Sequence, residues 1–159
     1  MPVTLTDYQK VNEHLQKNNI DSILYGSLGV SVYLGNFRDF DDIDLLVDET
    51  YIRGEWSKLI NIMSQIGFQL ADEHEHQFAN NEGTKVAFAS KNVLVEDNIC
   101  NPTKDGITIQ KDNITINTIT PESFIKAYTF SSTDGYRLEK RGDSDLQIVH
   151  KLKKLTGDI

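Results

Sequence analysis

The strongest signal in the sequence comes from two short stretches, Leu24-Tyr25-Gly26-Ser27 and Asp42-Ile43-Asp44-Leu45. The first joins an apolar run to a Gly-Ser pair, and the apolar residues that follow predict a helix over 28–34. The second opens a run that is apolar to Val47, which predicts a strand covered on both faces. Because side chains alternate along a strand, Asp42 and Asp44 should project from the same face.

The residue types in these two stretches fit phosphate and metal chemistry. Two carboxylates held side by side repel each other, and a cation between them relieves that repulsion; oxygen ligands favour Mg²⁺ or Mn²⁺. Gly26 and Ser27 stand where a strand gives way to a helix, and a helix N-terminus offers free N–H groups to a phosphate. Glycine permits close approach of the backbone. If the two strands are neighbours, the site is equipped for phosphoryl or nucleotidyl transfer.

This pattern resembles the signature of the DNA polymerase β-like nucleotidyltransferase superfamily: an apolar residue, Gly-Ser, a helix, then Asp-x-Asp flanked by apolar residues. The order of elements is similar to that of the small bacterial lincosamide and aminoglycoside nucleotidyltransferases. The resemblance covers roughly residues 20–90. A weaker likeness lies in Lys140-Arg141-Gly142-Asp143, followed by Asp145 and Leu146.

The resemblance implies a role for each matching residue. Gly26 and Ser27 would hold the β- and γ-phosphates of an NTP, and Asp42 and Asp44 would bind the catalytic metal ions. Arg38, in the polar loop before the second strand, is a further candidate for a phosphate contact, although a solvated arginine is equally compatible with the sequence.

The chain departs from the family pattern at one position. The family normally adds a third carboxylate on a later strand, where it acts as a base. The matching strand here is Lys85-Val86-Ala87-Phe88-Ala89, with Ala87 at the expected position. The sequence offers four substitutes without favouring one of them: Glu73, Glu75, Glu96 and Asp97.

Two stretches, one acidic and one rich in histidine, offer further candidate metal ligands. Asp39 to Thr50 does not fit a calcium-binding EF-hand, because its sixth position is Asp44 instead of glycine and its twelfth is not glutamate. His74-Glu75-His76 would place two histidines on one face of a strand. With no third ligand evident nearby, the sequence favours an exposed polar strand edge.

Composition narrows the function classes. The 159 residues fit one domain, or one domain with a small appendage. The net charge of −8 disfavours a long nucleic acid and a membrane surface as partners. Cys100 is the single cysteine, so an intrachain disulfide is excluded. No apolar run approaches the length of about 18 residues needed to span a membrane, and the expected compartment is the cytoplasm.

The remaining patterns predict the fold class α/β (α+β) with a small C-terminal helical cap, and the resemblance implies a nucleotidyltransferase-like mixed sheet flanked by helices. Thr6 and Gln9 fit a capping box for the first helix. Strands are expected over 68–78 and 84–89, and a hairpin over 107–118 with its turn at Asp112-Asn113. The last helix carries an apolar side made of Leu146, Val149, Leu152 and Leu155. We expect a core over 1–118 and a helical extension over 119–159 packed on it as a single compact unit.

We therefore expect a bacterial-type, metal-dependent nucleotidyltransferase that moves NMP from an NTP to a hydroxyl of a small molecule or a protein. The alternative is a catalytically impaired module that keeps the fold and binds nucleotide or a partner protein, in a regulatory or antitoxin-like role. Ala87 favours the alternative, whereas the Gly-Ser pair and the two aspartates favour the enzyme. The acceptor, the preferred base and the oligomeric state, a homodimer included, stay open.

Overall fold

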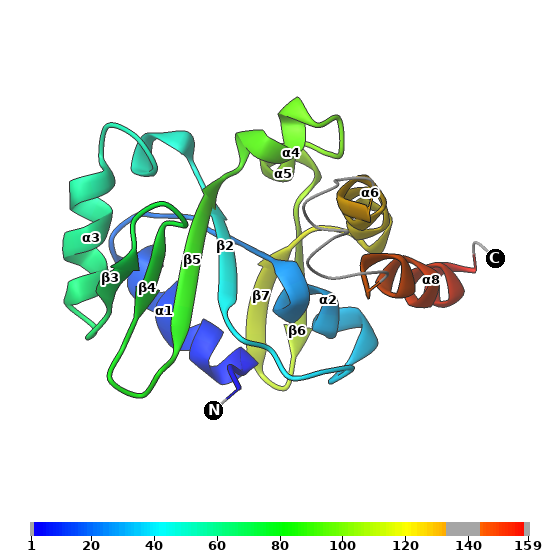
Figure 1. Cartoon of the computed structure of the whole chain (residues 1–159), viewed down its shortest axis with the longest axis horizontal. Helices are drawn as coiled ribbons and strands as arrows, with labels where there is room; N and C mark the ends of the chain where they lie inside the picture. The colour runs from blue at the N-terminus through cyan, green and yellow to red at the C-terminus, as the bar shows by residue number, and fades with distance from the viewer. Residues whose placement is uncertain (1, 133–143, 158–159) are drawn as a thin grey trace.

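The structure is a computed structural model that describes residues 2–132 and 144–157, and Figure 1 shows the arrangement of its elements. The strands are β1 (Ile23–Tyr25), β2 (Ile43–Val47), β3 (Gln69–Asp72), β4 (Gln77–Ala79), β5 (Lys85–Ser90), β6 (Ile107–Lys111) and β7 (Ile114–Thr118). The helices are α1 (Leu5–Lys17), α2 (Gly26–Leu34), the 3₁₀ helix η1 (Glu49–Tyr51), α3 (Trp56–Ser64), α4 (Asn92–Glu96), α5 (Pro102–Asp105), α6 (Pro121–Ser132) and α8 (Ser144–Thr156). The predicted mixed sheet flanked by helices is confirmed.

The main sheet has five strands in the order β1-β2-β5-β4-β3. β2 runs antiparallel to β1 and parallel to β5, and the pairs β5–β4 and β4–β3 are antiparallel. The pairing register sets Tyr25, Asp44, Ala87 and Gln77 side by side across four neighbouring strands. Directly paired residues project from the same face, so these four side chains form a row, called here the polar row.

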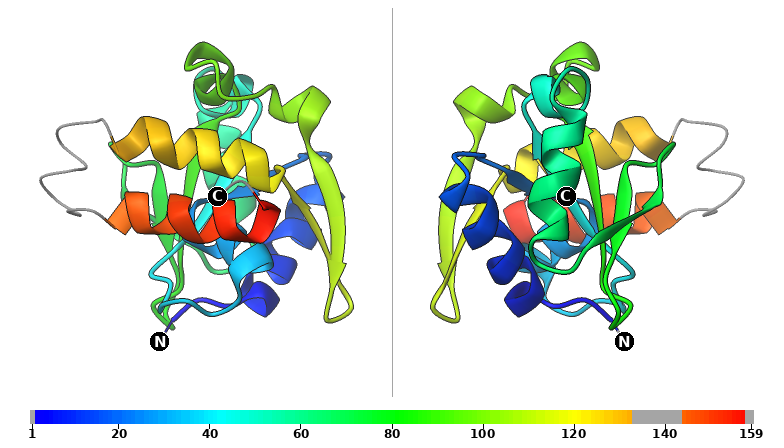
Figure 2. Two further views of the ribbon diagram at one scale, coloured as in Figure 1. Left: turned by 90° about the vertical axis from the view of Figure 1, so that its right-hand side faces the viewer. Right: turned by 90° about the vertical axis from the view of Figure 1, so that its left-hand side faces the viewer.

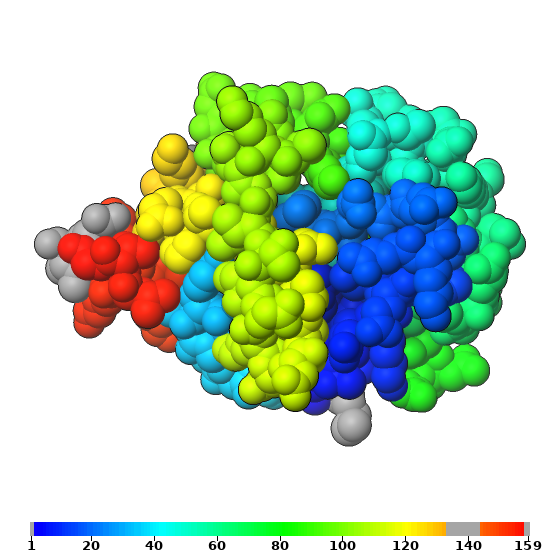
Figure 3. Space-filling model, turned by 180° about the vertical axis from the view of Figure 1, so that it is seen from behind, coloured from blue at the N-terminus to red at the C-terminus, as the bar shows by residue number. Residues whose placement is uncertain are grey.

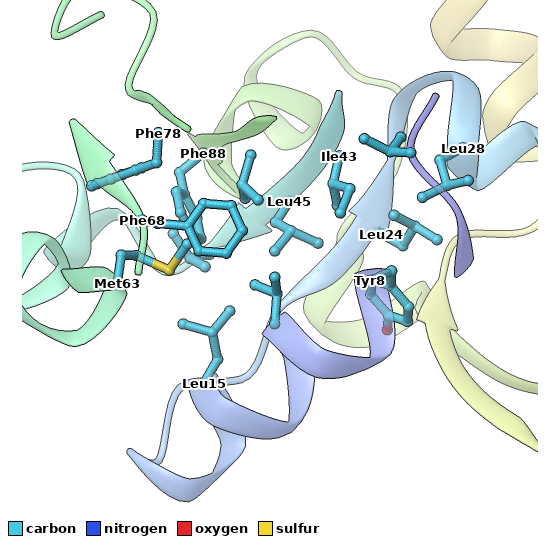
Figure 4. Close-up of a cluster of buried hydrophobic side chains, with 14 of the residues drawn as sticks. Tyr8, Leu15, Leu24, Leu28, Ile43, Leu45, Met63, Phe68, Phe78 and Phe88 are labelled. Atoms are coloured by element: carbon cyan, nitrogen blue, oxygen red, sulfur yellow. The ribbon is translucent and has the colours of Figure 1, made fainter. Parts of the chain in front are cut away.

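The opposite face of the sheet is covered by α1, α3 and the hairpin β6–β7. Ile43, Leu45 and Val47 of β2 are buried on this side. Figure 4 shows Met63, Phe68, Phe78 and Phe88 gathered at one end of this cluster, with Tyr8 and Leu15 of α1 below the sheet. Figure 3 shows β6 and β7 lying against α1 on the outer surface. The hairpin is fixed to the sheet by the Thr118 hydroxyl, which donates to the Leu24 carbonyl at 2.7 Å.

The face that carries the polar row is partly covered by α2, α6 and α8. Ile23 and Leu46 of the sheet pack there with buried residues of these helices, which are Val30, Phe124, Ala127, Tyr128, Ile148, Val149 and Leu152. Figure 2 shows α6 and α8 side by side at one end of the molecule. Because this cluster draws on β1 and β2 but not on β3 or β4, the far half of the polar row is left open.

The predicted apolar side of the last helix is confirmed at Val149 and Leu152, which are buried, and was wrong at Leu146 and Leu155. Leu146 and Leu155 are 49% and 54% exposed, and the buried side of α8 consists of Asp145, Ile148, Val149 and Leu152. At 3.6 residues per turn, positions 146 and 155 lie about two and a half turns apart and thus on opposite sides of a helix. Residues spaced three apart, such as 146, 149, 152 and 155, move progressively around the helix axis. Residues 145, 148, 149 and 152 stay on one side of the helix.

Two local predictions also need correction. The first helix is capped by Thr4 and not by Thr6: the Thr4 hydroxyl accepts from the Asp7 N–H, and the Asp7 carboxylate accepts from the Thr4 N–H. Aspartate at the third helical position thus replaces the expected glutamine. The single strand predicted over 68–78 is two strands, β3 and β4, joined by a turn over 73–76.

The predicted turn at Asp112-Asn113 is confirmed. Both residues have positive φ, 52° and 66°, the conformation required by the two-residue hairpin turns that match the twist of the strands. Among the helices that the structure describes, none is long and apolar enough to cross a membrane. The division into 1–118 and 119–159 stays a prediction.

Candidate functional site

The five residues singled out in the sequence line one cleft. The cleft has a volume of about 980 Å³ and opens on the face of the sheet that carries the polar row. Gly26 and Ser27 begin α2, and Arg38 comes from the loop between α2 and β2. Asp42 immediately precedes β2, and Asp44 is the second residue of that strand. The strands β1 and β2 are neighbours. This adjacency brings the Gly-Ser pair and the two aspartates together.

The Asp44 carboxylate lies directly beside the backbone of Gly26. A Cβ atom on Gly26 would lie 2.1 Å from the Asp44 Oδ2 atom and 2.9 Å from its Cγ atom. Gly26 also has a φ of +67°, a backbone conformation that is unfavourable for residues with a Cβ atom. The position therefore needs glycine for two reasons: the turn into α2, and the space that the Asp44 carboxylate occupies beside the backbone.

The N-terminus of α2 faces the cleft. The side chain of Tyr25, the N-cap residue of α2, makes no hydrogen bond to the first turn of the helix. The Ser27 hydroxyl is half-buried and accepts a hydrogen bond from the Arg38 Nη2 atom. Arg38 also lies over the Phe37 ring, 5.4 Å from its centroid. The predicted phosphate-binding residues thus form one connected group.

Tyr128 of α6 lines the same cleft as Ser27 and Asp44, and the sequence did not identify it. Its side chain is only 5% exposed. Burial raises the pKa of Tyr128 to about 12, and the nearby Asp44 carboxylate contributes to the rise. One signal was present in the sequence: a tyrosine on the buried side of a helix usually needs a hydrogen-bond partner.

The side of the polar row beyond Asp44 contains no acid. Ala87 of β5 is paired in register with Asp44, so it occupies the place beside the aspartate that the sequence analysis assigned to it. Gln77 of β4 is paired in turn with Ala87. The Gln77 Nε2 atom lies 3.5 Å from the Asp42 Oδ2 atom and donates to it. Gln77 therefore contacts the carboxylate pair from the next strand, a relation that sequence reasoning could not detect across 35 residues.

The four alternative acids do not complete a metal cluster. Glu75 and Asp97 line the cleft, whereas Glu73 and Glu96 are exposed and are not among its lining residues. Within 2–132 and 144–157, no group of three or more His, Cys, Asp or Glu side chains is arranged to hold a metal ion. Glu75 and Asp97 thus stay the candidates that share the cleft with Asp42 and Asp44, and the choice of a substitute for the third carboxylate stays open.

The histidine-rich stretch lies in the turn between β3 and β4, not on a strand. His76 has a φ of 52°, and its ring packs edge-on against Trp56 at a centroid distance of 4.8 Å. His74 is exposed, and neither histidine lines the cleft. The structural role of His76 is the closure of this turn. Residues 140–143, named in the resemblance, lie outside the described residues.

Comparisons with known proteins identify the class of the fold. The chain superposes on an antigenic nucleotidyltransferase-like protein of Paracoccidioides brasiliensis with a TM-score of 0.66, at 13% identity over 98% of this chain and 79% of that one. It superposes on the lincosamide antibiotic adenylyltransferase LnuA, in its lincomycin-bound form, with a TM-score of 0.64, at 17% identity over 98% and 99% of the two chains. The protein has the nucleotidyltransferase fold.

The sequence comparison identifies the family of the chain. It belongs to the family of the uncharacterized protein YnaI of Bacillus subtilis (strain 168), to which it is 30% identical over 145 residues, covering 86% of each chain. No protein-family model matches the sequence. The resemblance inferred from Gly26-Ser27 and Asp42-Ile43-Asp44 is thus confirmed at the level of the fold.

Proposed function

We propose that this protein is a metal-dependent nucleotidyltransferase that moves NMP from an NTP to a hydroxyl group of an acceptor, a small molecule or a protein. The observation that carries the proposal is the contact between Asp44 and Gly26, which sets a carboxylate pair directly beside the N-terminus of α2 at the wall of the cleft. A triphosphate bound between them would meet backbone N–H groups on one side and metal-binding oxygens on the other.

The charge of the cleft supports the metal requirement. Its described lining includes seven acidic side chains and one cationic side chain, Arg38. The acids are Asp39, Asp41, Asp42, Asp44, Asp72, Glu75 and Asp97. A triphosphate entering alone would be repelled by this lining. A divalent cation between the phosphates and the carboxylates reverses the sign of that interaction.

The residues present fit Mg²⁺ or Mn²⁺. Mg²⁺ is usually held by one or two carboxylates together with waters and substrate phosphates, and Asp42 and Asp44 are such a pair. When bound, the ion would neutralise the phosphates and favour in-line displacement. Gly26 and the first N–H groups of α2 would receive the β- and γ-phosphates, and Ser27 and Arg38 would add hydrogen bonds from the side of the loop.

In the transfer itself, the acceptor oxygen bonds to the α-phosphorus as the bond from that phosphorus to the bridging oxygen breaks. Pyrophosphate leaves, and the hydroxyl proton passes to a base. Ala87 lies where the fold would favour a carboxylate for that purpose, so in this protein the proton would pass to water or to a group that the acceptor brings. The chain's own contribution is then the positioning of the triphosphate.

Ala87 also supports a second candidate function, a module that binds an NTP with its metal but transfers nucleotide slowly or not at all. Both candidates share the binding step and differ in the chemical step. The rate of pyrophosphate release in the presence of Mg²⁺, an NTP and a library of hydroxylated acceptors separates them, because a binding module would bind the NTP and release little or no pyrophosphate.

The binding step is tested by thermal unfolding of the wild type with each NTP, with and without Mg²⁺. At one hundred times its dissociation constant a ligand stabilises by about 2.7 kcal/mol, which for this size raises the melting temperature by roughly 5–11 °C. The rise should require Mg²⁺ and be lost in the double variant Asp42→Asn, Asp44→Asn.

The matched control is Asp21→Asn, Asp112→Asn, which removes the same charge at exposed positions outside the cleft. This control should keep the full Mg²⁺-dependent rise. If no NTP stabilises the wild type with Mg²⁺, or if both double variants respond alike, the proposed function is wrong.

A further inference from the structure

The polar row ends in a glutamine that reaches back to the pair of aspartates. Gln77 belongs to β4 and Asp42 immediately precedes β2, and Figure 1 shows β5 lying between these two strands. Neighbouring strands are about 4.8 Å apart. The Gln77 side chain therefore crosses the width of β5 to bring its Nε2 atom within 3.5 Å of the Asp42 Oδ2 atom, to which it donates a hydrogen bond.

Ala87 leaves room for this contact. It is the residue of β5 that separates Gln77 from Asp44 in the pairing register, and its side chain is a single methyl group. An aspartate at position 87 would fill this space and add a third negative charge beside Asp44. The alanine and the glutamine contact therefore belong together, because the chain brings a neutral amide to the aspartates across a position that carries no acid.

The amide of Gln77 faces Asp42 although another carboxylate stands beside it in the sheet. Asp72 of β3 is paired directly with Gln77. The Asp72 Oδ1 atom accepts a hydrogen bond from the Glu75 N–H at 3.1 Å, which ties that carboxylate to the turn between β3 and β4. Asp72 is exposed, whereas Gln77 and Asp42 are half-buried. The amide thus donates to the carboxylate that is less solvated, where a hydrogen bond is stronger.

An ionised carboxylate can only accept hydrogen bonds, so the amide nitrogen of Gln77 makes this contact. A group that hydrogen-bonds to a metal ligand fixes the orientation of that ligand and commonly contributes about tenfold to a hundredfold to metal affinity. We propose that Gln77 is a positioning residue for the metal ion: it holds the Oδ2 atom of Asp42 and leaves the Oδ1 atom to ligate the ion together with Asp44. The inference rests on the proposed function and extends it by assigning a residue of β4 to the metal site.

The test uses two substitutions that remove the amide and differ in charge. Gln77→Met keeps a side chain of similar length without a hydrogen-bond donor, and it should weaken metal binding about tenfold. Gln77→Glu places a third carboxylate beside Asp42. It should therefore bind the metal ion more tightly than the wild type and, without metal, unfold at a lower temperature. A glutamine that served only the fold would give the same change in metal affinity in both variants.

The measurement is the dissociation constant for Mn²⁺, obtained from the electron paramagnetic resonance signal of the free ion, with Mn²⁺ alone and with saturating NTP. Gln110→Met is the matched control. Gln110 also lies on a strand, β6, and its Nε2 atom donates to the Thr115 Oγ1 atom at 2.7 Å, but it does not line the cleft. This variant should bind Mn²⁺ as the wild type does.

Unchanged Mn²⁺ affinity in Gln77→Met overturns the proposal. So does an equal loss in Gln77→Met and Gln77→Glu, or an equal loss in Gln110→Met. If Gln77→Met does not fold, Gln77→Asn takes its place: it keeps the amide on a side chain one carbon shorter, which cannot span the distance to Asp42, and should lose the same factor.

The proposed function fails in a different way. If the wild type binds Mn²⁺ neither alone nor with an NTP, or if Asp42→Asn, Asp44→Asn binds it equally well, the proposed function is wrong and the inference falls with it. If Mn²⁺ binding depends on the two aspartates and Gln77→Met binds the ion as the wild type does, only the inference about Gln77 is wrong.

Discussion

Gly26→Ala tests whether Asp44 depends on the absence of a side chain at position 26. An alanine at a φ of +67° pays for the left-handed conformation, about 1–2 kcal/mol. For a protein of this size that lowers the melting temperature by roughly 2–8 °C. The added Cβ atom would also lie 2.1 Å from Asp44 Oδ2, so the carboxylate must move. We therefore expect a larger loss of stability than the strain alone causes, and loss of the Mg²⁺-dependent stabilisation by NTP.

Gly67→Ala separates strain from the clash. Gly67 follows α3 with a φ of +86°, and a Cβ atom there would have no atom within 4 Å. This variant should lose stability to backbone strain alone and bind Mg²⁺–NTP as the wild type does. Thermal unfolding with and without Mg²⁺–NTP measures both effects. If Gly26→Ala unfolds at the same temperature as Gly67→Ala and binds NTP equally well, the assigned role of the Gly26–Asp44 contact is refuted.

Three further outcomes are expected. Ala87→Asp should lower the melting temperature without metal, by repulsion with Asp44, and raise the affinity for Mg²⁺ measured by titration calorimetry, whereas Ala87→Asn should do neither. Leu152→Ala, at a fully buried position, should cost about 2–5 kcal/mol in chemical unfolding, while Leu155→Ala on the exposed side should cost little. Burial raises the pKa of Tyr33 to about 12, so the folded state favours the neutral form of its hydroxyl. The contribution of Tyr33 to the free energy of unfolding should therefore be complete below pH 10 and decrease as the pH approaches 12. The decrease should be shallower in Tyr33→Phe.

The sequence predicted the part of the site whose residues lie close together along the chain. Gly26, Ser27, Asp42 and Asp44 fall within 19 consecutive residues, and one strand–helix–strand unit brings them together. Alternation along β2 placed the two aspartates on one side, and the strand composition predicted burial of its neighbours. The absence of an acid beside Asp44 was also visible, because the register of β5 follows from the apolar pattern around Ala87.

The remaining part of the site depends on contacts between distant segments. The approach of Gln77 to Asp42 follows from splitting the stretch 68–78 into two strands, and the turn that splits it contains no glycine or proline. Tyr128 was indistinguishable from a core residue because its helix position is a core position. A residue of this kind packs in the core and also lines the site. Its spacing along the sequence indicates only that it packs in the core.

The position of the cleft follows from where the second layer of helices ends. α6 and α8 cover the sheet over β1 and β2, where Ile23 and Leu46 are buried, and their cover stops before β4. Asp44 stands at this boundary, with the buried Tyr128 on one side and the open row of Ala87 and Gln77 on the other. A charge beside a low-dielectric wall interacts more strongly with a bound cation than one surrounded by water. The C-terminal helices therefore do more than cap the core: in the proposed function they strengthen the interaction of Asp44 with the metal ion, and the open half of the row leaves room for the nucleotide and its acceptor.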